Sequence, residues 1–543
     1  MSLQVARPVD KLERYNVTRS NLNIYHNVLV GNRIHSPHLA KYSLSSVQEW
    51  AQLLLDPITQ LIEQHPSLAL VVGDHLTAKP LFLYLKSINL LSLIRVVPIK
   101  TALQVDRIIE EEHNLPFDLS DQSTPLWRLV ITPTEDDPST FYLLYTFHHV
   151  IGDGRSAMAI TKQLVEQLNL LQQDRFDPRN ASLAGNTMQL SITSSHKPIP
   201  ASLESRINCY PSLRTLIYEA SRALFLPGFL KKAFEPRYWA GEMDSSLEVP
   251  NKTELSYLQF SPEDTSSIIR TAKRRSTTVQ SVLYAAAVFA VKLVFMSNAS
   301  SLSLSPSSSP SPSSFDDDND NKHSHGKQEE TIVFATPVSL RSLISKPIAP
   351  EDQGNYTSEI LHRKISVRNE SSFWTMAHGY RQQVVRATTT PSGLRGLLEH
   401  VGMLSLLPKQ DGAWEKFMAN QVKRDQHGRK ATIKVSNLGC GWDPSRPRDG
   451  QGSQEESTAA ALGFRVKDAV FSQSSGVTAS ALTMNVATAN GIMTMTTTWQ
   501  KATFQSRSRG DLFMKEFKRI LSEALDDARE EYSFSEAAYS AIV

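Results

Sequence analysis

The sequence predicts an α/β fold built from two halves, each with its own sheet and its own core. The 543 residues exceed what one hydrophobic core usually supports, so at least two cores are expected. Strand patterns alternate with helix patterns in both parts of the chain, and a polar stretch without periodicity separates them. We therefore expect residues 1–185 and 251–543 to form the halves, with 186–250 as a linker and amphipathic segment.

The first half begins with a helix and leads to a hairpin. Residues 45–64 carry apolar side chains at helical spacing. Two apolar runs, 126–132 and 141–147, flank the polar turn 133–139, which is typical of a β-hairpin. The other elements expected in this half are strands at 68–72 and 94–99 and helices at 104–114 and 156–171.

The second half shows further strands and helices and one long interruption. Ser261-Pro-Glu-Asp264 predicts a helix start, because a serine N-cap precedes two acidic first-turn residues. Residues 299–330 are rich in serine and proline and then in aspartate. Since this stretch lacks the apolar content of a core, we expect a disordered surface insertion. The expected elements are strands at 255–260, 331–337, 431–436 and 493–499 and helices at 263–275, 277–296 and 510–530.

Composition argues against several classes of protein. A net charge of +2 provides no electrostatic footprint for nucleic acid. Cys209 and Cys440 lie far apart, and the sequence has neither a CxxC pair nor an HExxH motif, so we expect no metal site. The N-terminus lacks a signal-peptide pattern, and we find no run of about 18 apolar residues. We therefore expect a cytoplasmic protein without a transmembrane segment.

An apolar segment at 213–234 is interrupted by Pro227 and Gly228. One interpretation is a surface helix packed on the core. The other is a peripheral contact with a membrane or lipid droplet, or a lid over an apolar substrate channel. The sequence leaves both interpretations open.

The strongest chemical signal is the segment His148-His149-Val-Ile-Gly152-Asp153-Gly154, which follows the predicted hairpin. Loops at the ends of strands are where α/β proteins place their chemistry. Because an imidazole titrates near neutral pH, His149 is a candidate general base. HxxxD spacing alone also arises by chance, and the alternative is that the two histidines merely pack at a strand end.

The glycines of this segment predict a turn with an unusual backbone conformation that projects His149 into a cleft. Asp153 lies about one tight turn further along the chain. Its carboxylate could orient the imidazole or anchor the loop through a salt bridge.

This segment and several short motifs resemble a known superfamily. A strand, HHxxxDG and a helix in this order are similar to chloramphenicol acetyltransferases, peptide-synthetase condensation domains and plant HxxxD acyltransferases. The remaining motifs resemble the fungal alcohol acetyltransferase family over nearly the whole chain. The Asp-Phe-Gly-Trp-Gly motif of the plant enzymes is absent, and Gly439-Cys-Gly-Trp442 is a weak match to it. The motifs are Glu13-Arg14-Tyr15, Arg19, Tyr25-His-Asn-Val28, Pro125-Leu-Trp-Arg128, Pro337-Val-Ser-Leu-Arg341, Gly354-Asn355-Tyr356 and Val435-Ser-Asn-Leu-Gly439.

The resemblance implies two chloramphenicol-acetyltransferase-like α/β halves with mixed sheets and an active-site channel between them. It implies that His149 is the general base at mid-channel and that no acyl-enzyme forms. Gly154 would belong to the catalytic group with His149 and Asp153, and His148 would support this site. Asp153 would have a structural role, with Arg341 as its ion-pair partner, because guanidinium binds carboxylate bidentately.

The resemblance also places Ser436 and Asn437 near the channel. They are candidates for stabilising the oxyanion that forms when a thioester is attacked. An equally weighted alternative is a turn capped by the Asn-Leu-Gly sequence.

The expected function is that of an acyl-CoA-dependent O-acyltransferase. It would use acetyl-CoA as cosubstrate, hold no permanently bound cofactor, and act as a monomer on a small hydrophobic alcohol or secondary-metabolite hydroxyl. One alternative is N-acetylation of an amine or amino-acid-derived small molecule by the same base. The other is a condensation-like module that binds a partner without turnover.

Overall fold

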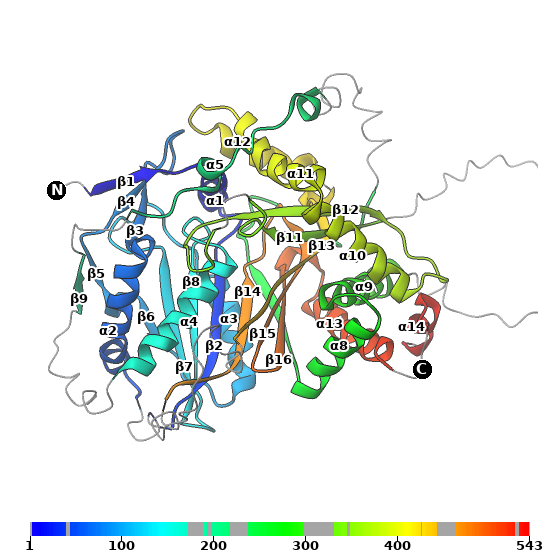
Figure 1. The fold of residues 1–543 in the computed structure, drawn as a ribbon, viewed down its shortest axis with the longest axis horizontal. Coiled ribbons are helices and arrows are strands. Elements are labelled where there is room, and N and C mark those ends of the chain that lie inside the picture. The colour runs from blue at the N-terminus through cyan, green and yellow to red at the C-terminus, as the bar shows by residue number, and fades with distance from the viewer. Residues whose placement is uncertain are drawn as a thin grey trace, which may run out of the picture.

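The computed structural model has two α/β halves packed side by side, the first blue to cyan and the second green to red in Figure 1. The predicted fold class is confirmed. The expected insertion at 299–330 and residues 218–234 of the apolar segment lie outside the described residues. The structure describes residues 3–37, 39, 44–171, 188–192, 198–217, 237–297, 331–344, 348–424, 426–442, 463–526 and 531–541.

The first half contains a five-stranded mixed sheet covered on both faces. In sheet order its strands are β14 (Arg465–Gln473), β2 (Val28–His35), β8 (Thr140–Phe147), β7 (Trp127–Pro133) and β6 (Ile94–Val96). Helices α2 (Val47–Gln64) and α4 (Gly154–Leu170) pack on one face, and α3 (Val105–His113) packs on the other. Every residue of β8 is buried, which explains why this strand is a continuous apolar run. The predicted hairpin is confirmed, because β7 and β8 pair antiparallel along their length.

The second half contains a six-stranded mixed sheet. In sheet order its strands are β10 (Thr253–Phe260), β16 (Ile492–Gln500), β15 (Ser480–Ala489), β13 (Ala431–Trp442), β11 (Ile332–Ser339) and β12 (Thr357–Ile365). Strand β13 is parallel to both of its neighbours, and the other pairs are antiparallel. Helices α8 (Pro262–Arg274), α9 (Val279–Val291), α10 (Phe373–Thr389) and α13 (Arg507–Ala524) belong to this half. Ser261 caps α8 by accepting from the Asp264 amide, as predicted.

Strand β14 joins the halves, because it comes late in the chain but completes the first sheet. It pairs antiparallel with β2 from Arg465↔His35 to Gln473↔Val28. In Figure 1 it appears in orange beside the blue β2. An ion pair between Arg33 Nε and the buried Asp468 Oδ2, at 2.8 Å, lies across this pairing. The boundaries at 185 and 251 stay a prediction, and the structure adds that residues 465–473 belong to the sheet of the first half.

Smaller elements surround these two sheets. Strands β1 (Gln4–Pro8), β4 (Leu81–Tyr84) and β3 (Leu70–Gly73) form one small sheet, and β5 (Ser87–Asn89) pairs with β9 (Gln189–Ser191). The remaining helices are α1 (Lys11–Asn21), α5 (Leu203–Arg206), α11 (Pro391–Gly402), α12 (Ala413–Arg424) and α14 (Phe534–Ser540).

The helix predicted at 277–296 is present, but the sequence analysis did not recognise how long its apolar stretch is. Among the described residues, Val279–Met296 is long and apolar enough to cross a membrane by length and composition alone. It comprises α9 and a following π-helical turn, Lys292–Met296. Residues 281–291 are all buried between neighbouring helices and the sheet of the second half. A helix surrounded by core is apolar on every side, which accounts for this composition.

Candidate active site

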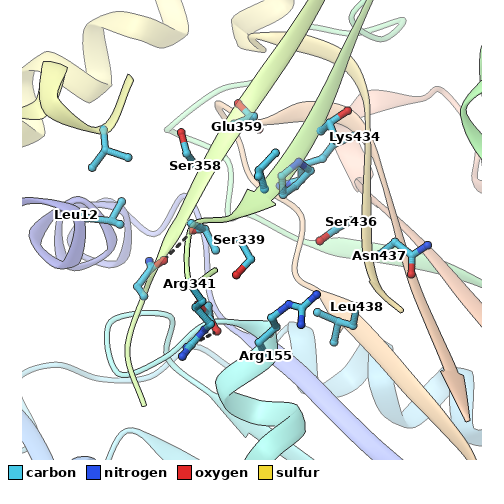
Figure 2. A pocket seen from close by; sticks show the side chains of 18 of the residues that line it. Leu12, Arg155, Ser339, Arg341, Ser358, Glu359, Lys434, Ser436, Asn437 and Leu438 are labelled. Atoms are coloured by element: carbon cyan, nitrogen blue, oxygen red, sulfur yellow. Dashed lines mark hydrogen bonds and ion pairs between the residues drawn. The ribbon is translucent and has the colours of Figure 1, made fainter. Parts of the chain in front are cut away.

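Both halves line a cavity of about 1150 Å³, part of which is drawn in Figure 2. Its walls come from α1, the turn after β8 and the start of α4 in the first half. In the second half they come from β11, β12, β13, α10 and α11. Of the residues predicted for the site, the cavity wall includes His149, Asp153, Gly154, Arg341, Ser436 and Asn437. His148 is not part of this wall and is buried instead.

Local interactions fix the turn that carries His149. Strand β8 ends at Phe147, and Asp153 is the N-cap of α4. The Asp153 side chain accepts from the Ser156 amide at 2.9 Å, and the Ser156 hydroxyl accepts from the Asp153 amide at 3.3 Å. Asn16 of α1 donates to the backbone carbonyl of His149 at 3.4 Å. The turn is therefore held at its helical end and against α1.

The glycines of the motif act through close packing, so the predicted unusual backbone at this turn was wrong. Neither Gly152 nor Gly154 has a positive φ. A Cβ atom at Gly154 would lie 2.7 Å from Cδ2 of Leu438 on β13 and 3.4 Å from the Phe471 ring on β14. Gly154 thus allows the start of α4 to approach two strands at once.

The ion pair predicted between Asp153 and Arg341 is present. Arg341 Nη2 lies 3.1 Å from Asp153 Oδ1, and the two side chains are 5% and 2% exposed. Arg341 also donates to the Ser156 hydroxyl at 2.8 Å and to the Gly354 carbonyl at 3.2 Å. The second carboxylate oxygen accepts from the Tyr356 amide at 3.1 Å. Asp153 therefore anchors α4 of the first half to the loops around β11 and β12 of the second.

His149 is held as a neutral imidazole inside the cavity. Burial, together with the charge of Arg19, lowers the pKa of His149 to about 4. Hydrogen bonds to the backbone carbonyls of His149 and Gly152 and the charge of Asp153 oppose this shift. Asn355 Nδ2 lies 3.4 Å from the imidazole Nδ1, and the Tyr25 ring centre lies 6.1 Å from the His149 ring centre. The ring is thus unprotonated at neutral pH and able to accept a proton.

His148 supports the turn from beneath. It is 2% exposed, and its Nδ1 accepts from the Val150 amide at 3.1 Å. Phe117 packs against it edge to face at 6.2 Å. Burial and the charges of His149 and Arg19 lower the pKa of His148 to about 3, so this ring is also neutral.

Ser436 and Asn437 lie in consecutive positions of β13 and both reach the cavity. Asn437 Oδ1 accepts from the Gly439 amide at 2.8 Å, and Gly439 has a φ of +78°. This contact is the capped turn considered as the alternative, and it occupies one end of the Asn437 amide. The Ser436 hydroxyl makes no hydrogen bond with another described residue, and Figure 2 shows it directed into the cavity. Ser436 is the better placed of the two donors.

A group of charged residues in the cavity wall was missed by the sequence analysis. Glu359 of β12 forms an ion pair with Lys430 at 2.8 Å, and Lys434 of β13 lies near both. Burial acting alone would raise the pKa of Glu359, but the charges of Lys430 and Lys434 lower it to about 2. The alternation along β13 could have revealed Lys434 and Ser436, because both face away from the buried Ile433 and Val435. Among the described residues, no cluster of three His, Cys, Asp or Glu side chains could hold a metal ion.

Solved structures with a similar fold include an acetyltransferase and a condensation domain. TRI3 trichothecene 15-O-acetyltransferase from Fusarium sporotrichioides has a TM-score of 0.59 at 11% identity, covering 95% of this chain and 94% of that chain. The condensation domain of the Monacolin K polyketide synthase MokA has a TM-score of 0.53 at 10% identity, covering 97% and 98%. At such identities the likeness shows the fold alone. The chain has the two-lobed fold that acetyltransferases and condensation domains share.

The sequence narrows this class to one family. The alcohol acetyltransferase family model matches residues 104–521, so the chain belongs to the alcohol acetyltransferase family, a group of acyltransferases. A relative, "Probable alcohol acetyltransferase crmB" from Aspergillus fumigatus, is 25% identical over 286 residues. This match covers 50% of the present chain and 55% of the relative, so the chain spans about half the length of that relative.

Proposed function

We propose that the protein transfers an acyl group from acyl-CoA to the hydroxyl of a small alcohol, with acetyl-CoA as the preferred donor. The observation that carries this proposal is a neutral His149 in the wall of a cavity that both halves line. Membership of the alcohol acetyltransferase family supports the choice of acyl group and acceptor.

His149 would act as the general base. The acceptor hydroxyl gives its proton to the imidazole as its oxygen attacks the thioester carbonyl. The tetrahedral intermediate then collapses, the carbon–sulfur bond breaks, and the imidazolium returns the proton to the departing CoA sulfur. No group on the protein is acylated in this sequence. A pKa near 4 leaves the imidazole free to start each cycle at neutral pH.

Ser436 would donate a hydrogen bond to the oxyanion of the tetrahedral intermediate. Its hydroxyl is uncommitted among the described residues and lines the same cavity as His149. The amide nitrogen of Asn437 is a second candidate donor, since only the Asn437 oxygen is used by Gly439. Asp153 and Arg341 would act as positioning residues, because their contacts hold the turn and β11 rather than reach a substrate.

The lining supports an acceptor with an apolar body. Aliphatic and thioether side chains from both halves dominate several walls of the cavity. They are Leu12, Val338, Leu343, Ile348, Val384, Val401, Met403 and Leu404. Burial of an apolar acceptor against them would supply binding energy of about 25 cal/mol for each Å² removed from water.

The test measures CoA release by purified full-length protein supplied with acetyl-CoA and a panel of alcohols and matched amines. We expect turnover with apolar alcohols and a loss of about 100-fold or more in kcat for His149→Ala. His35→Ala is the matched control. Strand β2 runs from Val28, which lines the cavity, to His35 at its far end, which does not. Absence of thiol release with every alcohol, or full activity of His149→Ala, would refute the proposal. Faster turnover of amines would favour N-acylation.

A further inference from the structure

A positively charged region lies at one end of the cavity, away from the Asp153–Arg341 pair. It is formed by Lys434 and Lys430 of the β13 segment, Glu359 of β12, and Arg19 of α1. Figure 2 shows Lys434 and Glu359 at one end of the drawn wall and Arg341 towards the other. The mechanism proposed above uses none of the lysines.

The charges of this region do not balance. Lys430 is neutralised by Glu359 at 2.8 Å. Lys434 makes no ion pair or hydrogen bond with any residue that the structure describes. Arg19 donates to the Asn16 side chain at 2.5 Å and stacks over the Tyr25 ring at 3.9 Å, and within the described chain it has no carboxylate partner. One carboxylate therefore faces three cations.

The unbalanced cation, Lys434, is also partly buried in the cavity wall. Burial lowers the pKa of Lys434 to about 8, even though the charge of Glu359 opposes the shift. A desolvated ammonium group without a partner is unfavourable, and an anion brought by a ligand would relieve this cost. The charge of Arg19 acts on both Lys434 and His149, so the region lies within electrostatic reach of the base.

We infer that Lys434 binds a carboxylate on the acceptor, so that the preferred acceptor is an apolar alcohol that also bears an acidic group. This inference rests on the proposed acyl transfer. Leu438 lies four residues after Lys434 on β13, and it packs against Gly154 at the start of α4, beside the turn that carries His149. At about 3.3 Å per residue, the carboxylate would bind roughly 13 Å from that point. An apolar chain between hydroxyl and carboxylate would lie along the aliphatic lining.

A phosphate of CoA has the same anionic chemistry, so the experiment separates the two sources. Binding of decanoate, 1-decanol and CoA to the full-length protein is measured by calorimetry. We expect wild-type protein to bind decanoate at least about tenfold more tightly than decanol, the low end for a charge-assisted hydrogen bond. Lys434→Met should remove this preference, whereas Lys434→Arg should keep it. Lys273→Met, an exposed lysine of α8, is the matched control.

Three results would overturn the inference. They are equal binding of decanoate and decanol to wild-type protein, equal weakening of both by Lys434→Met, and weaker CoA binding in that variant. The last would assign the lysine to the phosphates of CoA. Because these measurements need no turnover, a failure of acyl transfer remains distinguishable from a failure of anion binding. In turnover, Lys434→Met should raise the KM for 10-hydroxydecanoate at least about tenfold relative to wild type.

Discussion

Replacing Asp153 by asparagine tests how much the ion pair with Arg341 contributes to stability. The substitution removes the charge and keeps the shape of the side chain. Asparagine is as good an N-cap as aspartate, so the contact with the Ser156 amide should persist. The substitution does change the surroundings of Arg341. Its guanidinium is 5% exposed and would be left without a carboxylate partner.

The expected loss follows from this burial. Removing one partner of a buried pair costs about 3–5 kcal/mol, because the remaining charge stays desolvated. Arg341 keeps its bonds to the Ser156 hydroxyl and the Gly354 carbonyl, so we expect the low end, about 3 kcal/mol. A second substitution, Arg341→Met, removes that stranded charge. The double variant should therefore be less destabilised than the sum of the single variants, by at least about 1 kcal/mol.

Urea unfolding followed by tryptophan fluorescence measures these differences. Asp511→Asn is the matched control, because Asp511 is 51% exposed and lies 4.0 Å from Arg507. An exposed pair of this kind contributes about 0–1 kcal/mol. The reasoning is refuted if Asp153→Asn unfolds with a free energy within about 0.5 kcal/mol of wild type. It is also refuted if the effects of the two substitutions simply add.

Three further predictions concern the site. Ser436→Ala should lower kcat about 100-fold, and Asn437→Ala should lower it far less; steady-state kinetics with equal or reversed losses would contradict the assignment of the oxyanion donor. Because His149 must be neutral to act, kcat/KM for an uncharged alcohol should be constant between about pH 6 and 8 and fall as the pH approaches the His149 pKa of about 4; a profile that falls already near pH 6.5 would show an unshifted imidazole. Gly154→Ala should lower the melting temperature because its Cβ meets Leu438, and Leu438→Ala in the same chain should recover part of the loss; no recovery would mean that the contact is unimportant.

The parts of the fold that depend on neighbours along the chain were predictable. The hairpin of β7 and β8 and the cap at Ser261 follow from short patterns of apolar, polar and capping residues. The turn with His149 lies directly between a strand and a helix start, so its place in the fold was also visible. The reason for Gly154 was not visible, because this glycine packs against Leu438 of β13 and Phe471 of β14, which lie far away in sequence.

Strand β2 was missed although it lies inside the first sheet, between β14 and β8. Its sequence contains Gly31, Asn32 and Arg33, which weaken the apolar pattern of a strand. The tertiary structure supplies the reasons for two of them. A Cβ at Gly31 would lie 2.5 Å from the Leu144 side chain, and Arg33 pairs with Asp468 on β14. Gly31 and Arg33 are therefore explained by contacts with residues that are distant in the sequence.

The sequence by itself determined which chemical groups the protein carries and the local elements that present His149. Only the tertiary structure decided what surrounds them. Pairing of β14 with β2 joins segments more than 400 residues apart, and the charged end of the cavity combines Arg19, Glu359 and Lys434 from three distant segments. Such contacts form because burial of both sheet faces brings these segments together. The local pattern of apolar and polar residues does not show which segments will be buried against each other. The cavity, and the grouping of charged residues in its wall, could therefore be seen only in the tertiary structure.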